Sequence, residues 1–250
     1  MMFAHGLGCD QDMWRLLVPY FVQDYKLVLF DHVGSGKSDL EAYNREKYGS
    51  LGGYAADLLE ICAALELSEV ILVAHSVSAM VAVLAAAQNP APFADLILVA
   101  PSPRYTDDLD EGYVGGFSDD DIEGLLESLD SNHFAWASNL APMVMGNPQE
   151  PELAENLRDS FCRTNPSIFR HFARVTFSSD TRKELRNVRT RSLVMQCSND
   201  LLAPPEVGAY LQHNLAGSVL VNLEATGHCP HVSAPQATAA AIRQYLNESS

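Results

Sequence analysis

The residue best placed to act as a nucleophile is Ser76. It follows the apolar run Val70–Ala74 and precedes a stretch with helical spacing of apolar residues that begins near Ser78. A serine in a sharp turn between a strand and a helix projects its hydroxyl from the top of a sheet, and the crowded turn needs small residues two positions before and after it. Ala74 and Ser78 meet this need, although the usual pattern, G-x-S-x-G, has glycine at both places. Taken alone, the segment is more often a helix cap than a nucleophile.

A nucleophilic serine needs a base, and the base needs an acid to hold it. Asp200 follows the apolar run Leu193–Gln196, and His228 follows the run Val219–Leu223. If both runs are strands, both residues lie just past carboxyl ends at the sheet edge that carries Ser76, in the order serine, acid, histidine. A turn aspartate or a core histidine is common by itself. Type, order and placement together predict a Ser76–His228–Asp200 triad.

The turn His5-Gly6-Leu7-Gly8 adds a fourth element to this edge. Its glycines let the backbone approach a substrate closely. The backbone N–H groups of Leu7 and Val77 are predicted to bind the negative oxygen that develops when a carbonyl is attacked. The alternative interpretation is an ordinary tight turn.

These residues need a scaffold, and the hydrophobic pattern predicts one. Nearly continuous apolar runs are typical of strands buried on both faces, as in a parallel sheet covered by helices. They are Lys26–Phe30, Val70–Ala74, Leu96–Ala100, Arg191–Gln196 and Val219–Leu223. Stretches with helical spacing alternate with them, at Trp14–Val22, Tyr54–Leu65, Ser78–Gln88, Pro205–Leu215 and Pro235–Leu246. The alternation predicts an α/β fold with a mostly parallel sheet of about six strands.

The middle of the chain departs from this alternation. From about Arg104 to Arg189 there is no strong strand, and four helical stretches are separated by prolines. They are Asp119–Leu129, Phe134–Met145, Pro151–Cys162 and Ser167–Phe177. We interpret residues 104–189 as a four-helix cap inserted into a core made of residues 1–103 and 190–250. Such a cap is expected over the carboxyl ends of the strands, where open α/β sheets bind ligands.

Composition limits the possible partners. The 250 residues are 47% hydrophobic, with 16 Lys+Arg against 32 Asp+Glu and a formal charge of −16. This acidity argues against nucleic acid and against an anionic membrane surface. The five cysteines are odd in number and widely spaced, as expected for free thiols in a reducing compartment. With no basic, apolar leader and no run long enough to span a bilayer, a cytoplasmic protein is expected.

Two other patterns are weaker. The segment Val33-Gly34-Ser35-Gly36-Lys37-Ser38 resembles a phosphate-binding loop, but Asp31 stands where that motif requires its first glycine. His228 and His231 lie three residues apart without a second cluster of metal ligands. We therefore expect neither a cofactor nor a metal.

Several segments make the chain resemble an α/β-hydrolase from end to end. Its nucleophile segment, His75–Met80 (HSVSAM), is similar to that of the RsbQ-type stress-response hydrolases and of the plant strigolactone and karrikin receptors. Further matching segments are Gly8–Gln11 with Trp14, Phe30-Asp31 with Gly34–Gly36, Pro101–Tyr105, Gly115–Phe117 and Gly227–His231. The Cys-Pro-His run after His228 and the pair Phe161-Cys162 favour the RsbQ side.

The resemblance implies roles for particular residues. It assigns the triad to Ser76, Asp200 and His228, and the oxyanion donors to Leu7 and Val77. It implies a small apolar substrate pocket lined by His5, Tyr105, Phe117, Leu125, Trp136, Leu140 and Phe177. Three departures stand out: Ala74 replaces a glycine, Leu7 replaces an aromatic residue and should widen the pocket mouth, and the family's two opening strands are expected to be missing.

Three functions follow as hypotheses. The first is a serine hydrolase that cleaves a small, largely apolar ester or lactone through an acyl-enzyme, without a cofactor. The alternative is a ligand sensor of the same fold, with slow turnover, that acts through a regulatory partner such as a phosphatase or kinase with a sensor domain. The third is a binding module that retains the triad by descent, which no residue favours.

Overall fold

The computed structural model describes residues 1–248 and contains one parallel β-sheet within them. Its strand order is β2-β1-β3-β4-β5-β6, and every neighbouring pair runs parallel. The strands are β1 (Met2–Ala4), β2 (Val28–Leu29), β3 (Val70–His75), β4 (Phe93–Val99), β5 (Arg191–Asn199) and β6 (Val219–Thr226). The predicted parallel sheet of about six strands is confirmed. Three residues suffice for β1, which pairs with both β2 and β3.

Side chains from alternate strand positions enter two separate cores, as a pleated sheet requires. One face packs on α1 (Leu51–Ala64), α2 (Val77–Gln88) and α7 (Pro205–Asn214). The other face packs on α9 (Pro235–Asn247) and on the turns around Trp14 and Phe21. A short helix, α8 (Pro230–Ser233), precedes α9. Because both faces are covered, the strands consist of nearly unbroken apolar runs.

The prediction of a helix over Trp14–Val22 is wrong. Two short 3₁₀ turns, Gln11–Trp14 and Val18–Tyr20, replace it. The Asp10 side chain caps the first turn by accepting the Asp12 N–H, and Pro19 has no N–H with which to continue a longer helix. The apolar spacing still buries Trp14, as an amphipathic helix would, so periodicity alone did not separate the two structures.

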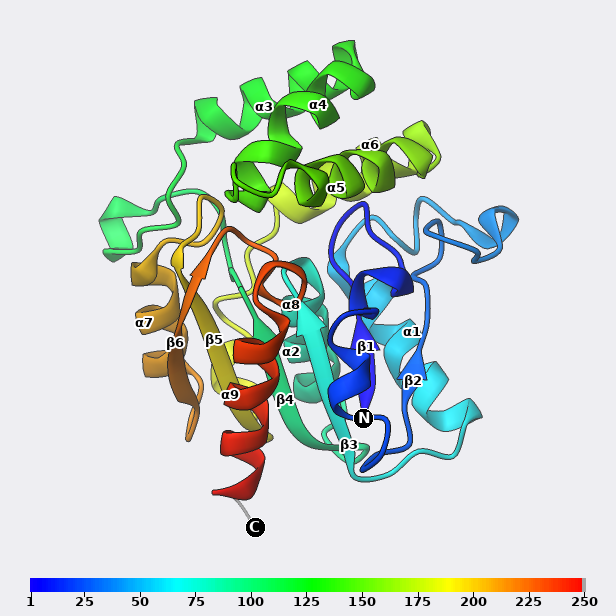
Figure 1. The fold of residues 1–250 in the computed structure, drawn as a ribbon, viewed down its shortest axis with the longest axis vertical. Helices are drawn as coiled ribbons and strands as arrows, with labels where there is room; N and C mark the ends of the chain where they lie inside the picture. Colours follow the sequence, from blue (N-terminus) through cyan, green and yellow to red (C-terminus); the bar gives the residue numbers. More distant parts are fainter. Residues whose placement is uncertain (249–250) are drawn as a thin grey trace.

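Four helices form a layer over the carboxyl ends of the strands, and we call this layer the cap (Figure 1). They are α3 (Asp119–Ser131), α4 (His133–Met145), α5 (Pro151–Arg163) and α6 (Pro166–Phe177). Ser118 and Asp121 exchange hydrogen bonds at the start of α3, Gly146 ends α4 in a left-handed conformation, and prolines begin α5 and α6. These local signals explain why the sequence located all four helices.

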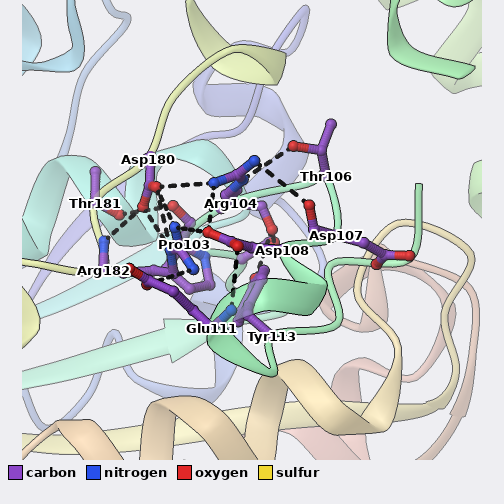
Figure 2. A network of polar contacts seen from close by, with 11 residues as sticks. Pro103, Arg104, Thr106, Asp107, Asp108, Glu111, Tyr113, Asp180, Thr181 and Arg182 are labelled. Atoms are coloured by element: carbon purple, nitrogen blue, oxygen red, sulfur yellow. Dashed lines mark hydrogen bonds and ion pairs between the residues drawn. The ribbon is translucent and has the colours of Figure 1, made fainter. Parts of the chain in front are cut away.

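The two chain segments that join the cap to the sheet are held together by an ionic network (Figure 2). The buried Arg182 guanidinium lies 2.7 Å from Asp180 and 2.8 Å from Asp108. Arg104 reaches the same two carboxylates, at 3.1 Å from Asp108 and 3.4 Å from Asp180. Arg182 also lies over the Tyr113 ring, 5.0 Å from its centroid. The segment entering the cap is thereby bonded to the segment leaving it.

Five histidines, each no more than 3% exposed, lie beneath the cap: His5, His32, His75, His228 and His231. Burial lowers the pKa of His5, takes the pKa of His32 and of His75 well below the usual range, and lowers the pKa of His231 to about 3. These four rings are therefore neutral near pH 7.

Within residues 1–248, no helix combines the length and the apolar character needed to cross a membrane.

Arg182→Met should destabilise the fold through the network at the base of the cap. Two carboxylates would lose their buried partner, at a cost of about 1–2 kcal/mol, which lowers the melting temperature by roughly 2–8 °C. Arg158→Met is the matched control, because Arg158 pairs with its neighbour Asp159 on the open surface of α5. The control should stay within about 0.5 kcal/mol of the wild type. Equal melting temperatures for both variants would contradict the prediction.

Acid should destabilise the protein through the buried histidines. Below about pH 6.5 the unfolded chain binds protons that the folded chain does not, so stability falls as the pH falls. Each neutral histidine contributes up to about 1.4 kcal/mol per pH unit. Urea unfolding between pH 7.5 and 5.5 measures this slope, and His231→Gln should flatten it. His213→Gln, at an exposed position, controls for the substitution. A stability that does not change over this pH range would overturn the prediction.

Candidate active site

The turn at Ser76 has the backbone geometry expected for a nucleophile between a strand and a helix. Its φ is 57° and its ψ is −124°, between the last residue of β3 and the first residue of α2. A residue other than glycine in this region is strained by about 1–3 kcal/mol and persists only where its surroundings hold it. The Ser76 N–H donates to the Val99 carbonyl at 2.9 Å, which fixes the turn to β4. Ala74 and Ser78 are both fully buried, as the crowded turn requires.

The three residues of the predicted triad lie in hydrogen-bonding contact. His228 Nε2 is 2.7 Å from Ser76 Oγ, and His228 Nδ1 is 2.7 Å from Asp200 Oδ2. The other Asp200 oxygen accepts the N–H groups of Leu202 and Ala203 at 2.9 and 3.3 Å. Since the Asp200 carboxylate only accepts, the proton of His228 lies on Nδ1, and Nε2 presents a lone pair to the serine hydroxyl. This arrangement allows His228 to remove the proton of Ser76.

Both the core and the cap hold the loop that carries His228. Gly227 has a φ of 87°, and a Cβ there would lie 1.9 Å from the Met145 carbonyl oxygen of α4. The His228 N–H donates to the Val144 carbonyl at 2.8 Å, and His75 Nε2 donates to the His228 carbonyl at 2.8 Å. His228 is therefore positioned by contacts from two layers of the molecule.

Two backbone N–H groups next to Ser76 are free to bind a ligand oxygen. Among residues 1–248, no protein acceptor takes the N–H of Leu7 or of Val77. Val77 begins α2, where the first N–H groups have no partner within the helix. The loop of Leu7 packs closely against the turn at Ser76, and Gly6 makes this possible because it has no side chain. A Cβ on Gly6 would lie 2.6 Å from His75 Nδ1 and 3.4 Å from Ser76 Cβ.

A narrow apolar cavity with a volume of about 30 Å³ lies beside Ser76 and His228. Four residues of the predicted pocket line it: Tyr105, Trp136, Leu140 and Phe177. Lining residues that the sequence analysis missed are Cys9, His75, Val144, Leu157, Phe161, Thr176, Leu202 and Cys229. Leu157 and Phe161 lie four residues apart in α5 and are both buried. Residues at this spacing share one face of a helix, so the apolar spacing in α5 could have indicated them.

Three residues expected in the pocket do not line this cavity. His5 is fully buried beneath it and bonds to backbone groups at both ring nitrogens. Phe117 and Leu125 are only partly buried and pack at the edge of the cap cluster. Their apolar character gave no information on whether they lie at the centre or at the rim of the cap.

The phenol and the two thiols that line the cavity keep their protons at neutral pH. Burial raises the pKa of Tyr105 to about 12. Burial also raises the pKa of Cys9 to about 12 and that of Cys229 well above its usual range, so both are neutral thiols. Within residues 1–248, no three His, Cys, Asp or Glu side chains gather as metal ligands would.

Comparison with known proteins identifies the family. Residues 1–241 match the model of the alpha/beta hydrolase family. The chain is 36% identical to the karrikin insensitive 2 receptor CA of Petunia hybrida, over 99% of this chain and 91% of the relative. It is also 36% identical to a strigolactone esterase of Arabidopsis thaliana, over 98% and 91%.

A solved structure agrees with this similarity. A hydrolase from Oleispira antarctica is 40% identical to the chain, with a TM-score of 0.95 over 98% of this chain and 90% of that one. The match covers the sheet, its flanking helices and the cap alike, which confirms the fold expected from the sequence. The chain therefore belongs to the alpha/beta hydrolase family.

Proposed function

We propose that the chain is a serine esterase that hydrolyses small, largely apolar esters or lactones through an acyl-enzyme. The observation that carries this proposal is the chain of two 2.7 Å contacts from Asp200 through His228 to Ser76, on a strained turn beneath an apolar cavity. The names of relatives support it, since the Arabidopsis relative is a strigolactone esterase and a relative from Oryza sativa subsp. japonica is named as a probable esterase.

Acylation begins when Ser76 Oγ attacks the carbonyl carbon of the ester while its proton moves to His228 Nε2. The carbonyl oxygen becomes negative and accepts the N–H groups of Leu7 and Val77. One such donor is typically worth about 2.7–4 kcal/mol of transition-state stabilisation. Asp200 keeps the imidazole in the productive orientation and stabilises its charged form.

Collapse of the tetrahedral intermediate breaks the bond to the leaving alcohol, which takes the proton from His228. The acyl group is then bonded to Ser76 Oγ. Water repeats the sequence: His228 removes its proton, the hydroxide oxygen attacks the acyl carbon, and Ser76 leaves with that proton. The products are a carboxylic acid and an alcohol, or a hydroxy acid where the substrate is a lactone.

The cavity limits the acyl group. Its volume of about 30 Å³ is far below the roughly 300–1,000 Å³ of pockets that enclose a whole drug-sized ligand. Phe177 forms part of its wall and also lines an outer groove of about 460 Å³ between α3 and α6. We propose a short acyl group in the cavity, with residues 104–189 acting as the cap domain over a core of residues 1–103 and 190–250.

Hydrolysis of p-nitrophenyl butyrate by the wild type and by Ser76→Ala tests the proposal. The variant should lose at least about 10³-fold in kcat, because it lacks the hydroxyl that becomes acylated. A fluorophosphonate should label the wild type and not the variant. Equal turnover by the two proteins would refute the serine esterase, and failure to label the wild type would favour a binding module.

The ligand sensor stays a prediction from sequence alone. Following the hydrolysis of p-nitrophenyl butyrate by stopped flow distinguishes it from an esterase. Rapid steady turnover is the result expected of an esterase. A burst of one equivalent followed by very slow release would instead indicate a protein that retains its ligand, and would direct attention to a partner.

Phe177→Ala should extend the range of acyl chains. Removing the ring joins the cavity to the outer groove, so the ratio of kcat/KM for p-nitrophenyl octanoate over acetate should rise at least about 10-fold. Phe134→Ala is the control, since Phe134 is 65% exposed on α4. An unchanged ratio in Phe177→Ala would show that this side chain does not limit chain length.

A further inference from the structure

Ser78 occupies the position where the usual G-x-S-x-G pattern has its second glycine, and its hydroxyl makes two hydrogen bonds. The side chain is completely buried at the start of α2. Its Oγ makes a short hydrogen bond to the His5 carbonyl oxygen and lies 2.7 Å from His32 Nε2. One hydroxyl therefore joins the start of α2 to the loop after β1 and to the loop after β2.

The protons of this network have one consistent arrangement. The carbonyl of His5 only accepts, so it takes the single hydroxyl proton of Ser78, and His32 Nε2 must donate to Ser78 Oγ. The backbone N–H of His32 donates to His5 Nε2 at 3.1 Å. His5 therefore carries its proton on Nδ1, which donates to the Gly6 carbonyl at 2.9 Å. Both rings are neutral in this arrangement, as their burial requires.

The hydrogen bond from His5 Nδ1 to the Gly6 carbonyl holds the peptide group that carries one of the proposed oxyanion donors. The Gly6 carbonyl and the Leu7 N–H belong to one planar trans peptide, so they point in opposite directions. Holding the oxygen on His5 Nδ1 thus sets the direction of the Leu7 N–H. The Cys9 N–H donates to the same oxygen at 3.2 Å, and Leu7 lines the cavity beside Ser76.

The surroundings of the network keep it in place. The His32 ring contacts the rings of Phe30, Tyr54 and Phe172, with centroids 5.2, 5.5 and 6.3 Å away. The His5 ring meets the His32 ring edge-on at 4.7 Å. Neither imidazole has room to adopt another rotamer without displacing core side chains.

We infer that Ser78 is a positioning residue, which acts through His32 and His5 to aim the Leu7 N–H at the oxyanion. The inference rests on the proposed function, because it assigns a task in the attack by Ser76. Ser78 touches no substrate, so its removal should weaken the binding of the transition state and not of the ground state.

The test compares Ser78→Ala with the wild type on p-nitrophenyl butyrate. Misplacing one donor should lower kcat about 10- to 100-fold, with KM within about 2-fold. The pH profile of kcat/KM should keep its midpoint, because the contact between His228 and Ser76 is unaltered. Ser192→Ala is the matched control, since Ser192 is equally buried and donates to the Thr190 carbonyl at the far end of β5.

A pair of inhibitors separates positioning from general damage. A short trifluoromethyl ketone adds Ser76 Oγ to its carbonyl carbon, passes the serine proton to His228 and leaves a negative oxygen for the two N–H donors. The carbinol with the same carbon skeleton cannot form this adduct. Ser78→Ala should bind the ketone about 10- to 100-fold more weakly and the carbinol within about 2-fold of the wild type.

Variants of His32 provide an independent measurement, which decides the matter if Ser78→Ala does not fold. His32→Gln retains a donor near the position of Nε2 and should keep kcat within about 3-fold. His32→Leu removes the donor and should resemble Ser78→Ala. Because the residues act in series, the double variant Ser78→Ala/His32→Leu should lose little more than either single variant.

The outcomes are distinct. A kcat for Ser78→Ala equal to that of Ser192→Ala, equal weakening of ketone and carbinol, or equal kcat for the two His32 variants would each overturn the inference and leave the esterase intact. Absence of Ser76-dependent hydrolysis in the wild type would overturn the proposed function, and the inference with it.

Discussion

The left-handed backbone at Ser76 is the constraint on which the candidate site depends. An L-residue with φ of 57° is unfavourable by itself, so the surroundings must hold it. β3 lies between β1 and β4, while α2 is buried along most of its length beneath α1. Neither element can shift to relax the turn without opening the core. The strain is thus maintained by hydrophobic packing far larger than itself.

A second feature is that the cap forms part of the framework of the site. The Val144 carbonyl of α4 accepts the N–H of His228, and Ser160 of α5 donates to the Gly8 carbonyl at 2.8 Å. A Cβ on Gly8 would lie within 2.4–2.5 Å of the Phe161 and Phe169 rings. The cap therefore contacts both the His228 loop and the loop of Leu7 and Gly8, while the Arg182 network holds its two connections together. The enclosure of the cavity and the position of His228 therefore depend on the same contacts.

Much of this arrangement was predictable, for identifiable reasons. Parallel strands bring their carboxyl ends to one edge, so residues that follow three apolar runs converge there although they are 28 to 152 positions apart. The cap helices were located because proline and capping residues mark their ends. The helix predicted over Trp14–Val22 was wrong, because an apolar spacing near 3.6 residues fits two 3₁₀ turns as well as one helix. Asp10 and Pro19 favour the turns.

The sequence by itself determined the fold class and the identity of the candidate serine, acid and histidine, because residue type, strand periodicity and chain order are local properties. Tertiary structure alone decided which cap residues face Ser76, since an apolar side chain at the centre and one at the rim look alike in sequence. It also turned His5 away from the cavity and joined it to His32 and Ser78. Hydrogen bonds between three separate segments depend on distances of a few ångströms, and no pattern along the chain encodes such distances.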